Sequence, residues 1–376
     1  MKKACLLFVF IITLFTQRIS AQDSASHLRI SLLTAGAGEE LYSTWGHTAL
    51  RIIDSVKQTD IIFNFGFFDF NDPDFYSKFT RGKLDYFLVA QSFTDFMYEY
   101  QVEKRYVIEQ ELLLSANSKL SIQEVLIQTL NSSARVYKYD FLYNNCTSRV
   151  RDILIKYGGL KSERALVPPG TTFRNMLHEF LDKGHPWSKL GIDLLLGSPI
   201  DKVANNTESM FLPEYLMKGV DSSQNLVLQK MVLLNGAPAE MPNNKLPLYI
   251  FSVITIVIFG ISVIKNKTAR IITRVLDITL FLVTGLLGCF LLFMWFGTDH
   301  KACAANYNLL WALPTNLVVV FALWKNPRWL QKYFYLCMVI HILTLLLWFW
   351  LPQQFNIALI PVVALLLQRC WKLGKL

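Results

Sequence analysis

The chain has 376 residues, of which 53% are hydrophobic and 17% charged. This balance is too apolar for a soluble enzyme of this length, and the length is sufficient for two domains. The net charge of +9 does not indicate a nucleic-acid partner, because much of the excess flanks apolar segments, as in KNKTAR and KNPRW, which is typical of membrane proteins.

The first segment, residues 1–21, has the layout of a signal peptide. A basic start is followed by an apolar stretch and by a small residue, Ala21. Cys5 lies too early to be a lipid-attachment cysteine. The sequence therefore predicts an exported protein that is cleaved after Ala21 and is not itself a lipoprotein.

Residues 22–221 are predicted to form an α+β domain. Five segments alternate apolar and polar residues or are rich in β-branched and aromatic residues, which indicates strands; they are 27–33, 47–54, 61–68, 84–90 and 105–114. Amphipathic helices are predicted over 121–133 and 146–159. In the second helix, Asn144 or Asn145 can cap the start and Gly158 offers a stop.

A linker over 222–247 is predicted to lead into an all-α membrane domain over 248–376. Five apolar segments have about the length that crosses a hydrocarbon core of ~30 Å; they are 248–264, 275–296, 308–324, 333–351 and 355–369. The first and third connections and the tail are rich in Lys and Arg, whereas GTDHKACAANYN and PQQFN are not. The positive-inside rule therefore places the basic connections in the cytoplasm and the α+β domain outside it.

Cys146 and His47 are the candidate catalytic residues. Cys146 begins a predicted helix, where the partial positive charge of the helix start favours thiolate over thiol. His47 begins a predicted strand and can pair with the thiolate and move protons. Asn64, on the next strand, is predicted to lie beside His47 and to orient its imidazole.

Structural readings of the same residues stay open at this point. A histidine at a strand start is more often a packing residue, and a disulfide between Cys146 and Cys303 is a serious alternative on the oxidising side of a membrane. Asp299 and His300 either face Cys146 across the domain interface or lie in a solvated loop. The phenylalanines of FNFGFFDFNDPDFYSKF pack in a core, dip into lipid or line an acyl-chain groove.

Other polar groups give no specific signal. Asp193 and Asp201 lie in WSKLGIDLLLGSPID, but no metal-ligand spacing occurs, so no metal and no cofactor is predicted. No glycine-rich phosphate loop is present. His178 and His185 are interpreted as ordinary polar residues.

The motifs WGH and YNNCTSRVRD, in that order, resemble those of the permuted papain-like group that includes the NlpC/P60-like and lecithin–retinol acyltransferase-like enzymes. More specifically, TAGAGEELYSTWGHTALRI, NFGFFDF, YNNCTSRVRD, GIDLLLG and MFLPEYL resemble the domain of the Lnb family of lipoprotein N-acyltransferases. In the membrane half, TDH and NYNLLWALPTNL resemble the outer loop and following span of that family, so the resemblance covers nearly the whole chain.

The resemblance implies a function at the bacterial inner membrane, with the catalytic domain facing the periplasm. An acyl chain would move from a membrane phospholipid, through a cysteine thioester, to the α-amino group of the diacylglyceryl-cysteine of apolipoproteins. His47 and Cys146 match the catalytic residues of the family, whereas Asn64 is inferred from strand position. Tyr139 and the backbone amide of Cys146 are candidate oxyanion donors, and Tyr139, Asp299 and His300 are candidate substrate-binding residues.

Two alternatives remain. A membrane-anchored NlpC/P60-like cysteine peptidase or amidase acting on cell-wall peptide uses the same thiol chemistry but needs no five-span anchor. The other alternative is a protein without catalytic activity, in which the outer domain binds a partner and Cys146 and Cys303 form a structural disulfide.

Overall fold

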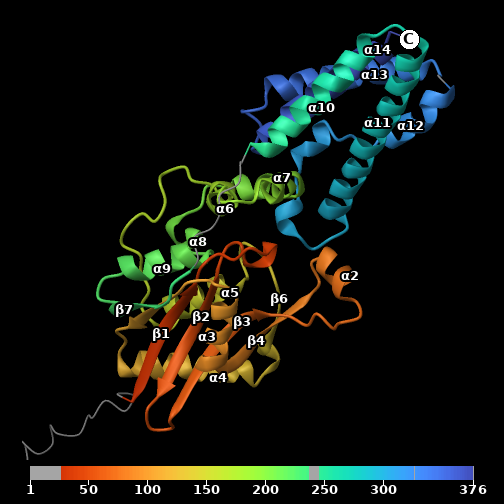
Figure 1. The fold of residues 1–376 in the computed structure, drawn as a ribbon. Helices are drawn as coiled ribbons and strands as arrows, with labels where there is room; N and C mark the ends of the chain where they lie inside the picture. Colours follow the sequence, from red (N-terminus) through yellow and green to blue (C-terminus); the bar gives the residue numbers. More distant parts are fainter. Residues whose placement is uncertain (1–26, 237–244, 326, 376) are drawn as a thin grey trace, which may run out of the picture.

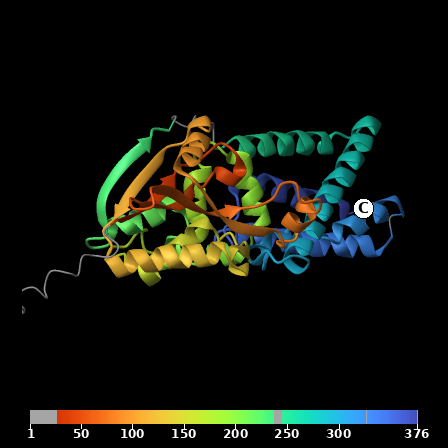
Figure 2. The ribbon, with the colours of Figure 1, turned by 90° about the horizontal axis from the view of Figure 1, so that it is seen from below.

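The computed structural model describes residues 27–236, 245–325 and 327–375. The predicted signal segment 1–21 lies outside these ranges. An N-terminal domain with one large sheet adjoins a helical domain, and the helices α6 and α7 lie between them (Figure 1). Viewed from below, the molecule is elongated, with the sheet at one end and the C-terminal helices at the other (Figure 2).

The N-terminal domain is built on a seven-stranded antiparallel sheet in the order β6-β4-β3-β2-β1-β5-β7. The strands are β1 (Leu28–Ala35), β2 (His47–Asp54), β3 (Thr59–Phe67), β4 (Asp85–Ser92), β5 (Val107–Leu112), β6 (Val136–Lys138) and β7 (Val227–Leu234). All five predicted strands are confirmed. These segments form strands because their side chains point alternately to the two faces of the sheet, and both faces are covered by helices. This arrangement is the predicted α+β class.

Helices cover both faces of the sheet. The helices of this domain are α2 (Phe75–Thr80), α3 (Phe93–Val102), α4 (Ala116–Leu130), α5 (Cys146–Tyr157), α6 (Phe173–Leu181), α7 (Pro186–Leu195), α8 (Asn206–Ser209) and α9 (Pro213–Ser222). One face packs Leu50 and Phe63 against α4, α5 and α9, and the other packs Ala49 and Ile62 against α3. The sheet is therefore a rigid support for residues at its strand ends.

The segment 222–247, predicted as a linker, contains β7, which pairs with β5 along the sheet edge. The N-terminal domain thus extends to Leu234 rather than ending at 221. The strand was missed because its side chains are mostly half-buried or exposed, so its apolar residues do not alternate as in a covered strand.

The helical domain follows in α10 (Leu246–Val263), α11 (Lys267–Phe296), α12 (Asn316–Lys325), α13 (Trp329–Leu346) and α14 (Ile360–Leu373). Within the described residues, α10, α11 and α13 are long and apolar enough to cross a membrane by length and composition. The expected spans 308–324 and 355–369 are each divided into a short 3-10 helix and an α-helix of 10 or 14 residues. Five crossings stay a prediction.

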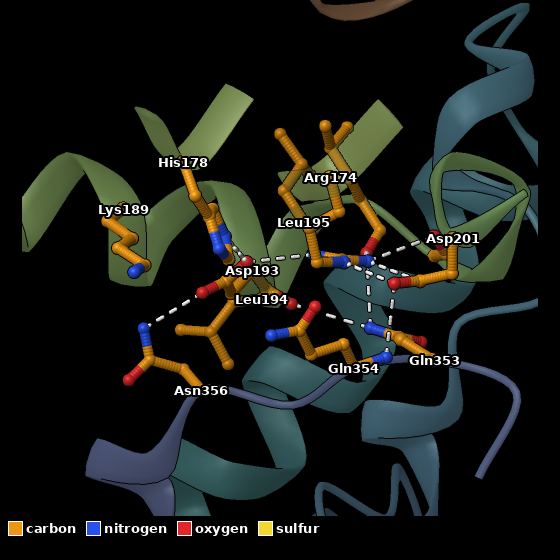
Figure 3. A network of polar contacts seen from close by, with 12 residues as sticks. Arg174, His178, Lys189, Asp193, Leu194, Leu195, Asp201, Gln353, Gln354 and Asn356 are labelled. Carbon is orange, nitrogen blue, oxygen red and sulfur yellow. Dashed lines mark hydrogen bonds and ion pairs between the residues drawn. The ribbon is translucent and has the colours of Figure 1, made fainter. Parts of the chain in front are cut away.

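A buried polar cluster joins the two domains (Figure 3). The guanidinium of Arg174, on α6, donates to Asp193 at 2.9 Å and to both carboxylate oxygens of Asp201 at 2.8 and 2.9 Å. From the helical domain, Asn356 donates to the other oxygen of Asp193 at 2.9 Å, and Gln353 donates to the carbonyl of Leu196 at 3.1 Å. We call Arg174, Asp193, Asp201, Gln353 and Asn356 the Arg174 joint.

The Arg174 joint explains two residues that gave no signal in the sequence. Asp193 and Asp201 accept hydrogen bonds from a fully buried arginine. His178, interpreted as an ordinary polar residue, is buried and pairs with Asp193 at 2.8 Å. Buried charges persist only when they are paired, so this cluster fixes the relative position of the two domains.

Candidate functional site

Cys146 is the first residue of α5, as predicted. Asn145 caps the helix: its side-chain oxygen accepts from the Ser148 amide at 2.8 Å, and the Ser148 hydroxyl accepts from the Asn145 amide at 2.8 Å. The Asn145 amide group also donates to the carbonyls of Phe141 and Phe211. This capping box, together with the tether to two other segments, fixes the start of the helix and hence the thiol.

His47 is the first residue of β2 and follows a tight turn at Gly46. Gly46 has φ +84°, and a Cβ there would lie 2.6 Å from the carbonyl oxygen of Ala35. Only glycine fits both conditions. The turn therefore brings the chain back into the sheet so that His47 pairs with Ala35 on β1.

Asn64 contacts His47, as the sequence predicted. The register of β2 and β3 pairs Leu50 with Phe63, which places Asn64 diagonally from His47 on one face of the sheet. The side-chain oxygen of Asn64, a buried residue, is hydrogen-bonded to Nε2 of His47. With Nε2–H donating to Asn64, Nδ1 is the nitrogen left to exchange a proton with another group.

Gly66 brings the histidine and the cysteine together. It has φ +101° and lies where the β3–β4 register shifts. A Cβ on Gly66 would lie 3.4 Å from Cβ of Cys146 and 3.7 Å from Cε1 of His47. Beside them, the hydroxyls of Thr48 on β2 and Thr147 on α5 are 3.1 Å apart and buried. The end of the sheet and the start of α5 thus form one site.

The electrostatics of the site favour a thiolate–imidazolium pair. Burial by itself raises the pKa of the Cys146 thiol, but the charge of His47 beside it, with hydrogen bonds from Thr147 and the Thr48 backbone, brings that pKa below its ordinary value. Burial lowers the pKa of His47, but the Cys146 thiolate and Asn64 outweigh it and raise that pKa. The arrangement supplies a nucleophile and a proton carrier near neutral pH.

Three buried or half-buried tyrosines feel the charge of Cys146. Burial, and after it the negative charge of the Cys146 thiolate, raise the pKa of Tyr86 to about 12. The same two causes raise the pKa of Tyr137 and Tyr139. Tyr139 stacks on Tyr86 with ring centroids 4.3 Å apart. These phenols stay protonated and can only act as neutral groups toward the thiolate.

The structure does not bring Asp299 and His300 to Cys146. The Asp299 amide donates to the carbonyl of Arg81 at 2.9 Å, and Nε2 of His300 pairs with the carbonyl of Phe79 at 3.0 Å. These contacts attach the loop that follows α11 to the segment around α2.

The expected disulfide alternative is not supported, because Cys146 and Cys303 are both free thiols. Cys303 is buried in a cluster with Trp45, Phe173 and Met294, and burial raises its pKa to about 12. A thiol with such a pKa is a poor nucleophile at neutral pH. Cys146 is thus the better candidate nucleophile of the two.

Sequence reasoning missed Gly46, Gly66, the Thr48–Thr147 contact and the two further tyrosines. For Gly66 a signal was present, since an isolated glycine within a strand pattern marks a bulge or a close backbone approach. The threonines and tyrosines carry no such signal, because they meet only through the sheet order.

We expect the pairing with His47 to be measurable as the pH dependence of Cys146 alkylation. Alkylation requires the thiolate, and a depressed thiol pKa keeps the thiolate at lower pH. In His47→Ala the pKa rises again, so the rate with iodoacetamide at pH 6.5 falls about tenfold or more, since each pKa unit changes the thiolate fraction about tenfold. Asn64→Ala keeps the imidazole, so its alkylation rate falls less than that of His47→Ala. Identical pH profiles for the parent and His47→Ala contradict the ion pair.

Two family models match the sequence. Residues 15–179 match the Lnb N-terminal periplasmic domain, and residues 241–374 match the Lnb transmembrane domain. No curated protein and no solved structure matches the chain. The first range contains His47, Asn64 and Cys146, the second contains α10 to α14, and the two together take in most of the chain.

Proposed function

Because the chain belongs to the Lnb family, with a periplasmic domain followed by a transmembrane domain, we propose that it is a lipoprotein N-acyltransferase. It moves an acyl chain from a membrane phospholipid to the α-amino group of the diacylglyceryl-cysteine of apolipoproteins. Between the two steps, the acyl group is held as a thioester on Cys146. The products are a lysophospholipid and a triacylated lipoprotein.

The observation that carries this proposal is the Cys146–His47–Asn64 arrangement in a domain joined to membrane helices. The depressed pKa of Cys146 and the raised pKa of His47 support a thiolate nucleophile with a proton donor beside it. The Arg174 joint connects this domain to the helical domain through buried charges. Both substrates are membrane-anchored. A site held near the membrane surface therefore keeps the thiolate close to the reacting groups of both substrates.

In the first half-reaction, the Cys146 thiolate attacks the ester carbonyl of the phospholipid. The oxyanion forms near the backbone N–H of Cys146. Cys146 is the first residue of α5, so this N–H and the partial positive charge of the helix start stabilise the oxyanion. The C–O bond then breaks, and the imidazolium of His47 protonates the departing alkoxide. This leaves an acyl-Cys146 thioester, a neutral His47 and lysophospholipid.

In the second half-reaction, the neutral α-amine of the acceptor attacks the thioester. His47, now neutral, takes the proton that the amine loses, and the C–S bond breaks to release the thiolate. The thiolate–imidazolium pair is thereby restored. Since an α-amine has a pKa of about 8, it is partly protonated at neutral pH and a base assists this step.

Tyr139 is proposed as a neutral group of the substrate site, because burial and the Cys146 thiolate raise its pKa and keep its hydroxyl protonated. Asp299 and His300 are proposed to act indirectly, by holding the α2 segment against the outer loop. Asn64 is a positioning residue that fixes the ring of His47. The order histidine then cysteine supports a permuted papain-like relationship for the domain.

We further propose that the protein spans the inner membrane several times with its catalytic domain in the periplasm. The apolar helices α10, α11 and α13 and the basic connections support this orientation. A cysteine peptidase or amidase acting on cell-wall peptide is the alternative class. It shares the thiol chemistry but gives no role to the helical domain.

The test is mass spectrometry of lipoproteins from cells that lack N-acylation, with and without this chain. We expect the N-terminal cysteine to carry two acyl groups without the chain and three with it. The matched control is the Cys146→Ala chain at equal abundance. If lipoproteins stay diacylated while cell-wall peptides are cut in a Cys146-dependent manner, the peptidase alternative replaces the proposal.

A further inference from the structure

A row of aromatic rings in contact with one another runs from Tyr139 toward the helical domain. Starting at Tyr139, ring centroids are separated by 4.3 Å to Tyr86, 5.0 Å to Phe68, 5.7 Å to Phe75 and 6.0 Å to Phe79. Phe70 packs beside Phe68 and Phe75 at 4.6 and 5.2 Å. We call Tyr139, Tyr86, Phe68, Phe75 and Phe79 the aromatic row.

The inner end of the aromatic row is the candidate site. Tyr139 and Cys146 both pack against the same core cluster, as do Phe68 and Phe75. A Cβ on Gly66 would lie 3.4 Å from Cβ of Cys146, and Phe68 follows Gly66 by two residues. The inner end of the row therefore lies beside the candidate nucleophile.

The outer end of the aromatic row lies at the end of a membrane helix. The carbonyls of Phe79 and Arg81 hold His300 and Asp299, which follow closely after α11 ends at Phe296. Gly82 approaches the same loop so closely that a Cβ would lie 3.2 Å from the His300 amide nitrogen. Figure 1 shows α2 as the part of the N-terminal domain that faces the lower end of α11.

The side chains at this outer end are exposed and apolar. Phe70, Tyr76 and Phe79 are 67%, 82% and 53% exposed, and Phe296 at the end of α11 is 73% exposed. Aromatic residues at the ends of membrane helices gather at the membrane–water interface. The α2 segment thus meets the level of the lipid headgroups and upper acyl chains.

We propose that the aromatic row is the path along which the donor acyl chain reaches Cys146. This inference rests on the proposed function and specifies its substrate: the chain is long and apolar, and it enters from the outer leaflet beside α2 and α11. Aromatic faces offer a large apolar contact area at low conformational cost. Phe68 and Phe75 are half-buried, so an acyl chain that packs against them is partly shielded from water.

The experiment measures acylation of Cys146 alone, without an acceptor. The full chain is reconstituted in vesicles of dipalmitoyl phosphatidylethanolamine and phosphatidylglycerol, and acyl-Cys146 is trapped and quantified. The same protein is then given the soluble ester p-nitrophenyl butyrate. For Phe68→Ala and Phe75→Ala we expect the ratio of the palmitoyl rate to the butyryl rate to fall about tenfold, as expected when a major apolar contact to the long chain is lost.

Two controls accompany these variants. Tyr98→Ala removes an exposed aromatic ring on α3, away from the row, and is expected to keep the parent ratio. Phe75→Leu keeps an apolar side chain and is expected to recover most of the ratio. The butyryl rate reports a folded site in every variant.

The outcomes separate the path from the function. If the parent forms no acyl-Cys146 from phospholipid, the proposed function fails and the path fails with it. If the parent forms it and the alanine variants keep the ratio, or lose both rates equally, only the path is overturned. If the variants form acyl-Cys146 normally but transfer it slowly to a diacylated peptide, the row serves the acceptor instead, which also overturns the path.

Discussion

Replacing Cys146 with alanine is expected to abolish N-acylation of lipoproteins, with a loss of at least about 10³-fold, because no other group in the site supplies a thiolate. The buried capping box at Asn145 and Ser148 does not involve the thiol, so the helix start is retained. The measurement combines trapped acyl-enzyme with full transfer to a diacylated peptide. Neither product is expected from Cys146→Ala.

The matched control is Cys303→Ala. Cys303 is a buried free thiol whose pKa is raised to about 12, and its removal leaves the nucleophile in place. Most activity is expected to remain. Equal loss in both variants, with an intact disulfide in the parent, argues against Cys146 as nucleophile.

Replacing Arg174 with methionine is expected to lower the free energy of unfolding by about 3–5 kcal/mol, since it leaves the buried carboxylates of Asp193 and Asp201 without their cation. Methionine keeps an apolar side chain of comparable length, so the loss comes chiefly from the uncompensated charges. The measurement is the thermal unfolding transition of the purified protein in detergent.

Lys138→Ala provides the comparison. Lys138 and Asp85 form an ion pair at 2.6 Å, but both side chains are more than half exposed. An exposed pair contributes at most about 1 kcal/mol, so a small shift is expected. If Arg174→Met unfolds at the temperature of the parent, the joint is not a source of stability.

Particular elements show why the fold was partly readable from the sequence. β2 and β3 alternate apolar residues because each faces a helix layer, and α5 has apolar positions at helical spacing together with an Asn cap and a glycine stop. β6 and β7 were missed because one has three residues and the other is a partly exposed edge strand. The sequence pattern predicts a strand poorly where the burial of that strand depends on neighbouring elements.

The candidate site was readable to the same extent. Cys146 at a helix start and His47 at a strand start carry local signals, and Asn64 followed from strand register. For Asp299 and His300 the sequence left open whether they face Cys146 or lie in a solvated loop; their contacts lie at 79–82. The direction in which the outer loop folds depends on how the domains join, and the polar spacing within GTDH holds no information about that.

The sequence by itself indicated a membrane protein with a periplasmic domain, the strands and helices with strong periodicity, and the candidate pair of Cys146 and His47, because these depend on composition and on neighbours along the chain. Only the tertiary structure decided which residues surround that pair. Gly66, Thr48 and the tyrosines meet Cys146 and its neighbour Thr147 through the order of β6, β4, β3 and β2. Arg174 and Asp193 likewise became a joint only when α6, α7 and the helical domain packed together, because burial strengthens the interaction between charges that attract only weakly in water.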